Sequence, residues 1–264
     1  MHILVLPAFN PGPYTGEGNN TYLVPGREPL LVDAGVGDAR HLDAIAAALD
    51  GQPLARVVVT HNHSDHIKGI EAVAARWPGA ILLKRPWPEK DVKYSVAWRP
   101  LQEGDEVVAG EARLRVIETP GHAPDHVCLF EPSSRLLFGG DLLVRDGTVV
   151  IPPTFGGSLA RYLKSLEKLL ALGVSRVLAA HGREIEEPDA LIRRYLAHRL
   201  QRQAQIVRAL ERGAADLDAI VAQVYVGLRP EVAAAAGESV LAHLIKLEEE
   251  GRAAKDDEGR WRVT

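Results

Sequence analysis

Residues 61–66 place four side chains that can ligate a metal ion within six positions: His61, His63, Asp65 and His66. They directly follow residues 57–59, a β-branched apolar run that predicts a buried strand. Because alternate side chains of an extended segment point the same way, His61 and His63 can bind one ion. Asp65 and His66 can face a neighbouring ion where the chain turns into a helix. Imidazole and carboxylate donors together favour zinc, and iron or manganese also accept them.

Three more side chains that can ligate a metal lie far along the chain, each just past a predicted strand. His122 follows residues 114–118, Asp141 follows residues 136–138, and His181 follows residues 174–179. In isolation they would be interpreted as a turn histidine, a capping residue and a histidine at a helix start. Strand ends on one edge of a layered fold converge in space. Their shared position therefore favours one metal site, built together with residues 61–66, over a histidine-rich surface loop.

The elements that must position these residues are short strands with helices between them. Gly/Pro turns separate predicted strands at residues 3–6, 21–24, 30–33, 57–59, 80–83, 107–108, 114–118, 126–130, 136–138 and 174–179. Helices are predicted from an N-cap at Asp38 to Leu49, over residues 67–77, and after an N-cap at Ser158. This order predicts two sheets packed face to face with helices outside.

Length and composition describe an ordinary folded protein. The 264 residues suffice for one large domain, or for one domain with a small second one, and 46% of them are hydrophobic. A formal net charge of −4 gives no sign of a polyanion-binding surface. The single cysteine, Cys128, excludes an internal disulfide and fits a reducing compartment. With no signal peptide and no apolar run of membrane-spanning length, we expect a cytoplasmic protein without membrane contact.

The order of these ligands resembles the metallo-β-lactamase superfamily, whose fold is an αββα sandwich. The resemblance rests on His61-x-His63-x-Asp65-His66, followed by His122, Asp141 and His181. It implies that His61, His63 and His122 hold a first ion, that Asp65, His66 and His181 hold a second, and that Asp141 bridges them. We expect two zinc ions, with Mn²⁺ or Fe²⁺ as alternatives.

The implied chemistry is hydrolysis. Two ions about 3.5–4 Å apart can share a hydroxide and lower the pKa of water towards ~7, which gives a nucleophile at neutral pH. We expect Asp65 and His63 to be catalytic residues. Asp65, bound to a single ion, could also orient the hydroxide or carry its proton, and loss of His63 should abolish activity.

Two departures from the superfamily's pattern reduce the number of subfamilies that this chain can resemble. The bridging position is Asp141, whereas true β-lactamases of the superfamily have Cys or Ser there, so antibiotic hydrolysis is not the expected main activity. The segment between Asp141 and His181 is too short for the large inserted domain of the cleavage-factor nucleases. Glyoxalase II thioesterases, lactonases and transfer-RNA-processing nucleases share all seven ligands, so the ligands do not separate these activities.

The C-terminal region predicts a winged helix, because three helices, at residues 189–212, 217–225 and 238–250, precede a hairpin around residues 256–259. We therefore predict a catalytic domain at residues 1–200 and a winged-helix domain at residues 201–264. With this tail the chain resembles the β-lactamase-like protein 2 family. Matching segments are Gly121-His122, Ser165-Leu166, Ala180-His181-Gly182 and Leu244-x-x-Leu247-Glu248-x-Glu250-Gly251. The best-known members of that family are endoribonucleases that act on single-stranded RNA.

The charge of residues 201–264 argues against duplex DNA as a partner. These residues carry nine Lys or Arg against eleven Asp or Glu, and phosphate neutralisation supplies most of the affinity for nucleic acids. We expect the winged helix to pack against the catalytic domain, or in a homodimer.

Residues 86–104 contain the sequence candidates for substrate binding. Lys93, Tyr94 and Trp98, together with Trp87, interleave cations with aromatic rings, which can neutralise and stack a single strand. The alternative is an ordinary loop whose tryptophans pack on the sandwich. The leading hypothesis is a two-metal hydrolase that cleaves RNA. A glyoxalase II-type hydrolase of a small ester, thioester or lactone is the second, and a non-enzymatic winged-helix regulator is the third.

Overall fold

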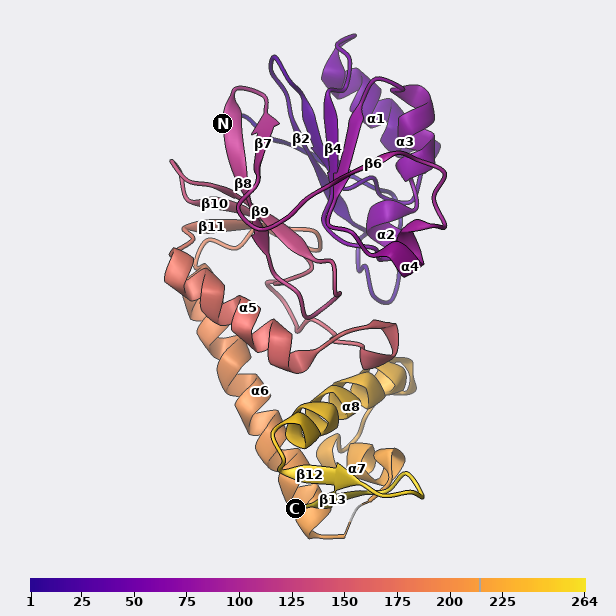
Figure 1. Ribbon diagram of the computed structural model, residues 1–264, viewed down its shortest axis with the longest axis vertical. Coiled ribbons are helices and arrows are strands. Elements are labelled where there is room, and N and C mark those ends of the chain that lie inside the picture. The colour runs from indigo at the N-terminus through magenta and orange to yellow at the C-terminus, as the bar shows by residue number, and fades with distance from the viewer. Residues whose placement is uncertain (214) are drawn as a thin grey trace.

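The computed structural model describes residues 1–213 and 215–264, in which two β-sheets pack face to face and a helical lobe follows (Figure 1). The two sheets form the upper part of Figure 1, and the C-terminal residues form the lobe at the bottom. This is the αββα sandwich with a C-terminal winged helix that the sequence predicts.

The first sheet has six strands in the order β1-β2-β3-β4-β5-β6. Their bounds are β1 Leu4–Pro7, β2 Asn20–Val24, β3 Leu30–Val32, β4 Arg56–Val59, β5 Ile81–Lys84 and β6 Trp98–Pro100. Strands β3 to β6 run parallel, so their carboxyl ends meet at one edge. Strand β4 is buried on both faces from Val57 to Val59, as its unbroken β-branched run predicts.

Helices α1 Ala39–Leu49, α2 Ser64–Ile67 and α3 Ile70–Arg76 cover the outer face of this sheet. Asp38 caps α1 through the backbone N–H of Arg40, which confirms the predicted helix start. The helix predicted over residues 67–77 is interrupted at Lys68 and Gly69. A Cβ on Gly69 would lie 2.3 Å from the carbonyl oxygen of Ala34, so close backbone packing fixes this break.

The second sheet has five strands in the order β11-β10-β9-β8-β7. Their bounds are β7 Glu106–Ala109, β8 Ala112–Glu118, β9 Val127–Glu131, β10 Leu136–Gly140 and β11 Arg176–Ala179. Its inner face packs on the first sheet through buried side chains such as Val58, Leu114 and Phe138. Helix α5 Leu159–Leu172, capped by Ser158, covers its outer face together with the start of α6 Pro188–Glu211.

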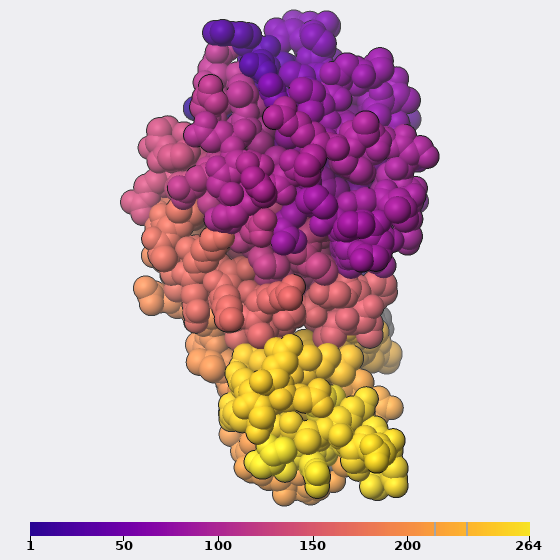
Figure 2. Space-filling view, in the orientation of Figure 1, coloured from indigo at the N-terminus to yellow at the C-terminus, as the bar shows by residue number. Residues whose placement is uncertain are grey.

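The C-terminal lobe has its own core. Helices α7 Leu217–Val224 and α8 Ala233–Glu249, the hairpin of β12 Ala253–Lys255 and β13 Trp261–Val263, and the second half of α6 form it. The 3₁₀ helix η2 Pro230–Val232 precedes α8. Figure 2 shows this lobe at one end of the molecule. No helix among the described residues combines the length and apolarity needed to cross a membrane.

Helix α6 confirms the helix predicted at residues 189–212, and the predicted domain boundary between residues 200 and 201 lies within it. Its two halves enter two hydrophobic cores. One feature differs from the sequence predictions. The predicted connector at residues 86–104 contains the short helix α4 Pro88–Asp91 and strand β6. The sequence does not predict strand β6, because its three residues show no alternation of apolar and polar side chains. Its extended conformation is instead stabilised by pairing with β5.

Replacing Leu244 with Ala should lower the free energy of unfolding by about 2–5 kcal/mol, because this α8 side chain is fully buried and its loss leaves a cavity. The matched control is Leu200→Ala on α6, where the side chain is 65% exposed and the change should stay within about 0.5 kcal/mol. Chemical denaturation measures both values, and equal losses would contradict the packing described for α8.

Candidate metal centre

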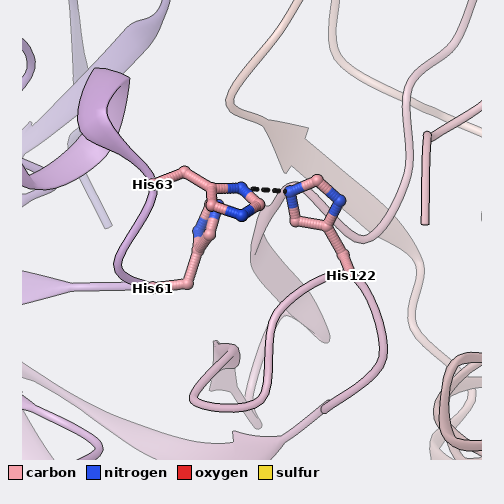
Figure 3. Close-up of side chains that lie close together, drawn as sticks. All are labelled: His61, His63 and His122. Atoms are coloured by element: carbon pink, nitrogen blue, oxygen red, sulfur yellow. Dashed lines mark hydrogen bonds between the residues drawn. The ribbon is translucent and has the colours of Figure 1, made fainter. Parts of the chain in front are cut away.

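The first group of donors consists of His61, His63 and His122. Their ligating atoms lie within 4.8 Å of one another, and Nε2 of His122 is 2.7 Å from Nδ1 of His63 (Figure 3). His122 donates its Nδ1–H to the carbonyl oxygen of Val150 at 2.7 Å, which leaves Nε2 for an ion. Burial is the main cause that lowers the pKa of each of these three histidines. All three are therefore neutral imidazoles at neutral pH, the form that ligates metals.

The second group consists of Asp65, His66, Asp141 and His181, again with ligating atoms within 4.8 Å. Nε2 of His181 lies 3.3 Å from Oδ2 of Asp65 and 3.2 Å from Oδ1 of Asp141. Burial opposes a charge on His66, but the carboxylates of Asp141, Asp33 and Asp65 outweigh it and raise its pKa well above the usual value. In this group, protons on the two histidines offset the charge of the two carboxylates. A metal cation that displaces these protons could bind the same nitrogen and oxygen atoms.

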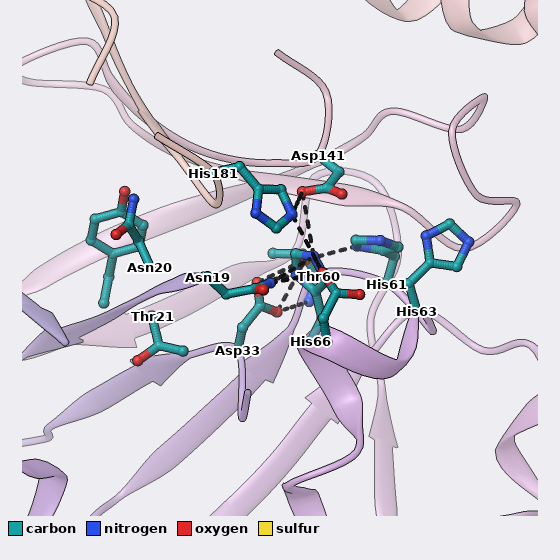
Figure 4. A network of polar contacts seen from close by, with 12 residues as sticks. Asn19, Asn20, Thr21, Asp33, Thr60, His61, His63, His66, Asp141 and His181 are labelled. Carbon is teal, nitrogen blue, oxygen red and sulfur yellow. Dashed lines mark hydrogen bonds and ion pairs between the residues drawn. The ribbon is translucent and has the colours of Figure 1, made fainter. Parts of the chain in front are cut away.

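Asp141 faces both groups. Its Oδ1 lies 3.3 Å from Nε2 of His66 (Figure 4). Its Oδ2 lies 3.4 Å from Nε2 of His122. One carboxylate with an oxygen toward each group is placed to bridge two ions. The structure therefore brings together all seven residues predicted as ligands, in the two groups that the sequence predicts.

The donors fit a pair of transition-metal ions. Nε2 of His61 is buried, and no group among residues 1–213 and 215–264 forms a hydrogen bond with it. A buried nitrogen of this kind carries a desolvation cost unless a cation uses its lone pair. Three imidazoles in one group, and two imidazoles with two carboxylates in the other, are donor sets that zinc, iron and manganese accept.

Asp33 and His126 hold the ligands in place and were missed in the sequence. Asp33 accepts hydrogen bonds from the backbone N–H of Thr60 at 2.8 Å and from Nδ1 of His66 at 2.8 Å. His126 accepts the backbone N–H of Asp141 at 3.0 Å and contacts Thr119 at 2.8 Å. Asp33 directly follows β3, so the rule that found the ligands at strand ends could have found it too. The sequence predicts His126 at the start of a strand, and no sequence signal separates it from a core histidine.

Two glycines let the ligand-bearing loops approach their neighbours. Gly140 has φ +49°, and a Cβ there would lie 2.7 Å from Nε2 of His126. Gly121 has φ +148°, and a Cβ there would lie 2.3 Å from the Cα of Tyr162 on α5. The residues that follow them, Asp141 and His122, depend on these close contacts for their positions.

The predicted substrate residues lie in different places. Tyr94 and Trp98 pack against the hydrophobic cluster under the helices of the first sheet, so both pack on the sandwich, and Lys93 is exposed. Trp87 is linked to the ligand-bearing loop by hydrogen bonds. Its backbone N–H donates to Asp91 Oδ2 at 2.7 Å, and Asp91 Oδ1 accepts from Asn62, between His61 and His63, at 2.9 Å.

Comparison with known proteins agrees with this geometry. Residues 14–181 match the family described as "Metallo-beta-lactamase superfamily", and residues 217–261 match the "Beta-lactamase associated winged helix domain". The fold and the paired donor groups define the protein as a metal-dependent hydrolase. The chain belongs to the metallo-β-lactamase superfamily and carries the beta-lactamase-associated winged helix.

Individual relatives share much of the chain. A "Beta-lactamase-like protein 2 homolog" of Drosophila melanogaster is 32% identical over 262 residues, covering 92% of this chain and 86% of that protein. This confirms the resemblance seen in the sequence. An "Atrochrysone carboxyl ACP thioesterase" of Cryptosporiopsis sp. is 30% identical over 206 residues, covering 76% of this chain and 61% of that protein.

Solved structures share the fold. A beta-lactamase domain protein from Burkholderia ambifaria superposes with a TM-score of 0.85 at 23% identity, covering 99% of this chain and 91% of that one. A protein solved in a di-iron-bound form gives a TM-score of 0.57 at 25% identity, covering 74% of this chain and 98% of that one.

The Asp141→Ala variant should bind fewer ions than the wild type, because one carboxylate faces both donor groups. We expect about two transition-metal ions per wild-type chain and at most about one in the variant. Metal analysis by mass spectrometry after gel filtration measures both. The control is Asp146→Ala, an exposed residue paired with Arg183. Full metal content in Asp141→Ala would remove this residue from the centre.

The stability of chelator-treated protein should fall at alkaline pH. Burial opposes a charge on His181, but hydrogen bonds to Asp141 and Asp65 outweigh it and raise its pKa to about 9. Because this pKa exceeds the unfolded value of about 6.5, the stabilisation is complete below pH ~6.5 and is lost as pH rises through about 9. Melting temperatures between about pH 7 and about pH 10 measure the loss. His181→Gln should flatten the profile, and an equally steep fall in that variant would contradict this assignment.

Proposed function

We propose that the protein is a two-metal phosphodiesterase that cleaves single-stranded RNA with zinc or manganese. The observation that carries this proposal is an aromatic ring with a cation, on a segment hydrogen-bonded to the loop between His61 and His63. Lys90 of α4 places its ammonium 5.4 Å from the ring centroid of Trp87. An aromatic ring and a cation together can stack a base and neutralise its phosphate.

Trp87 is close to the ligands on two sides. Through Asp91 it is tied to Asn62, which lies between two histidines of the first group. A Cβ on Gly156 would lie 2.8 Å from Pro124 and 3.2 Å from the ring of Trp87, so these three residues meet. Pro124 is two residues past His122. A base stacked on Trp87 would therefore have its phosphate near the first donor group.

A buried ion-pair network supports the same segment. Nζ of Lys84, which is 1% exposed, lies 2.8 Å from Asp91 and 2.7 Å from Asp125. A charge removed from water needs such partners, and the loss of one leaves the others unpaired. Lys84 thus connects α4 with the loop that carries His122.

The residues of the chain have separable roles in this reaction. Ions bound to the two groups would lower the pKa of water and polarise the scissile group. Among the causes acting on Asp65, burial favours its neutral form, but His66 and His181 outweigh it and lower its pKa, so it is a carboxylate at neutral pH. It can orient a nucleophile by accepting its hydrogen bond. His63 directs Nδ1 at the first group, and its loss would remove one of three donors there.

The winged helix supports the catalytic domain in this proposal. Ala242 of α8 packs into the core under the second sheet, and Thr154 donates a hydrogen bond to Glu238 of α8. Thr154 lies in the 3₁₀ helix η1 Pro153–Phe155, next to Gly156. The helix that would enter a DNA groove is therefore packed on the catalytic domain (Figure 1). A tight, sequence-selective gel shift with duplex DNA would contradict this role.

A thioester or lactone hydrolase is the second candidate. It is favoured by the relative whose printed name is a thioesterase, and the same donor groups can serve a carbonyl substrate. The two candidates differ in what surrounds the donors. RNA needs the stacking ring and cation, whereas a small thioester needs a compact site.

Metal-loaded protein should cleave single-stranded RNA internally, and His63→Ala should lose this activity because one of three donors of the first group is gone. Gel analysis of end-labelled oligoribonucleotides measures this cleavage, with S-lactoylglutathione and bis-p-nitrophenyl phosphate as parallel substrates.

A second set of variants tests whether RNA contacts Trp87 or the residues predicted from the sequence, Lys93, Tyr94 and Trp98. Trp87→Ala should lower the ratio of kcat/KM for RNA over that for bis-p-nitrophenyl phosphate by about 5- to 100-fold. Trp98→Ala should lower stability and leave this ratio unchanged. Turnover of S-lactoylglutathione orders of magnitude faster than that of RNA would replace the nuclease assignment with the thioesterase.

A further inference from the structure

Asn19 is a buried amide that touches the second donor group. It is 1% exposed, directly precedes β2, and forms an isolated bridge with His181. Its Nδ2 lies 3.0 Å from Oδ2 of Asp65 and 3.2 Å from Nε2 of His66. Asn19 is not among the seven residues that the sequence predicts as ligands.

The orientation of this amide follows from its hydrogen bonds. The backbone N–H of Asn19 donates to Oδ1 of Asn10 at 2.9 Å, and a backbone N–H can only donate. This fixes Oδ1 of Asn10, so the other arm of Asn10 is its amino group, which donates to Oδ1 of Asn19 at 2.8 Å. The remaining arm of Asn19, directed at the donor group, is therefore its amino group.

The two N–H groups of this amino group have different partners. One donates to the carboxylate of Asp65. The nearest other polar atom is Nε2 of His66, 3.2 Å from the amide nitrogen, and Nδ1 of this histidine donates to the carboxylate of Asp33 at 2.8 Å. Nε2 is thus the nitrogen of His66 that would ligate an ion. A nitrogen whose lone pair ligates an ion cannot also accept a hydrogen bond.

From this geometry we infer that Asn19 is a substrate-binding residue. In the metal-loaded protein its second N–H is left to donate to an oxygen of the substrate held at the second donor group, a phosphoryl or carbonyl oxygen. The amide nitrogen has no lone pair for a metal, so Asn19 is a donor and not an eighth ligand. Asn10 is a positioning residue that keeps this donor turned toward the site.

This inference rests on the metal centre and not on RNA as the substrate. Inorganic phosphate carries the oxygens that the donor would contact, whichever ester the enzyme hydrolyses. The probe is therefore inorganic phosphate, titrated calorimetrically into zinc-loaded protein, with zinc content measured on the same samples.

The Asn19→Ala variant should keep the zinc content of the wild type and bind phosphate about 10-fold more weakly, the loss expected for one hydrogen bond to a charged acceptor. Its kcat/KM for bis-p-nitrophenyl phosphate should fall by at least as much. Asn10→Asp keeps the acceptor for the backbone N–H of Asn19 but removes the donor to its Oδ1. It should weaken phosphate binding in the same direction by a smaller factor.

The control is Thr15→Ala, which removes a hydrogen bond from Thr15 to the carbonyl oxygen of Asn10 in the same loop. It should change phosphate affinity by less than about twofold, because it leaves the amide pair intact. Unchanged phosphate affinity in Asn19→Ala, loss of zinc from that variant, or a wild type that binds no phosphate would each overturn the inference. Failure to cleave RNA would leave these results standing and would count against the proposed function alone.

Discussion

The carboxylate of Asp33 is the contact on which the centre depends. It stands at the end of β3, has φ +66°, and accepts from the backbone of Thr60 at the end of the neighbouring parallel strand. The same carboxylate accepts a hydrogen bond from His66, which lies within α2. Two strand ends and one ligand are thus tied by a single buried acid. A carboxylate at this depth is stable only with such donors, so the site and the strand edge stabilise each other.

The sequence predicts which seven residues meet because strand ends on one edge of a layered fold converge, whatever the details of packing. The spacing of residues 61–66 marks the site, and His122, Asp141 and His181 join it through their positions just past strand ends. The rule does not give the environment of a loop. The sequence leaves open whether Trp98 and Tyr94 stack a substrate or pack on the sandwich. Strand β6 pairs with β5, and both side chains pack against the hydrophobic cluster of the first sheet and its helices. Long-range pairing of three residues decides this, and no local pattern encodes it.

Asn19 and His126 are residues of the site that the sequence does not predict. Neither has a residue type or spacing that marks a site, and both act through one hydrogen bond to a ligand or its backbone. Such roles depend on distances of a few tenths of an ångström between segments far apart in the chain. They become visible only when the two sheets are placed against each other.

Helix α6 belongs to both parts of the chain, which limits how they can evolve separately. Its first half packs under the second sheet with Leu191, Ile192 and Tyr195, and its second half enters the C-terminal core with Ile206 and Leu210. Recombination within this helix would join half of one core to half of another and leave apolar surface unmatched on both sides. We therefore expect that the winged helix cannot readily be exchanged between proteins as an independent domain. Sequence change in α6 is constrained by one core in its first half and by the other core in its second half, so we expect the two parts to diversify as one unit.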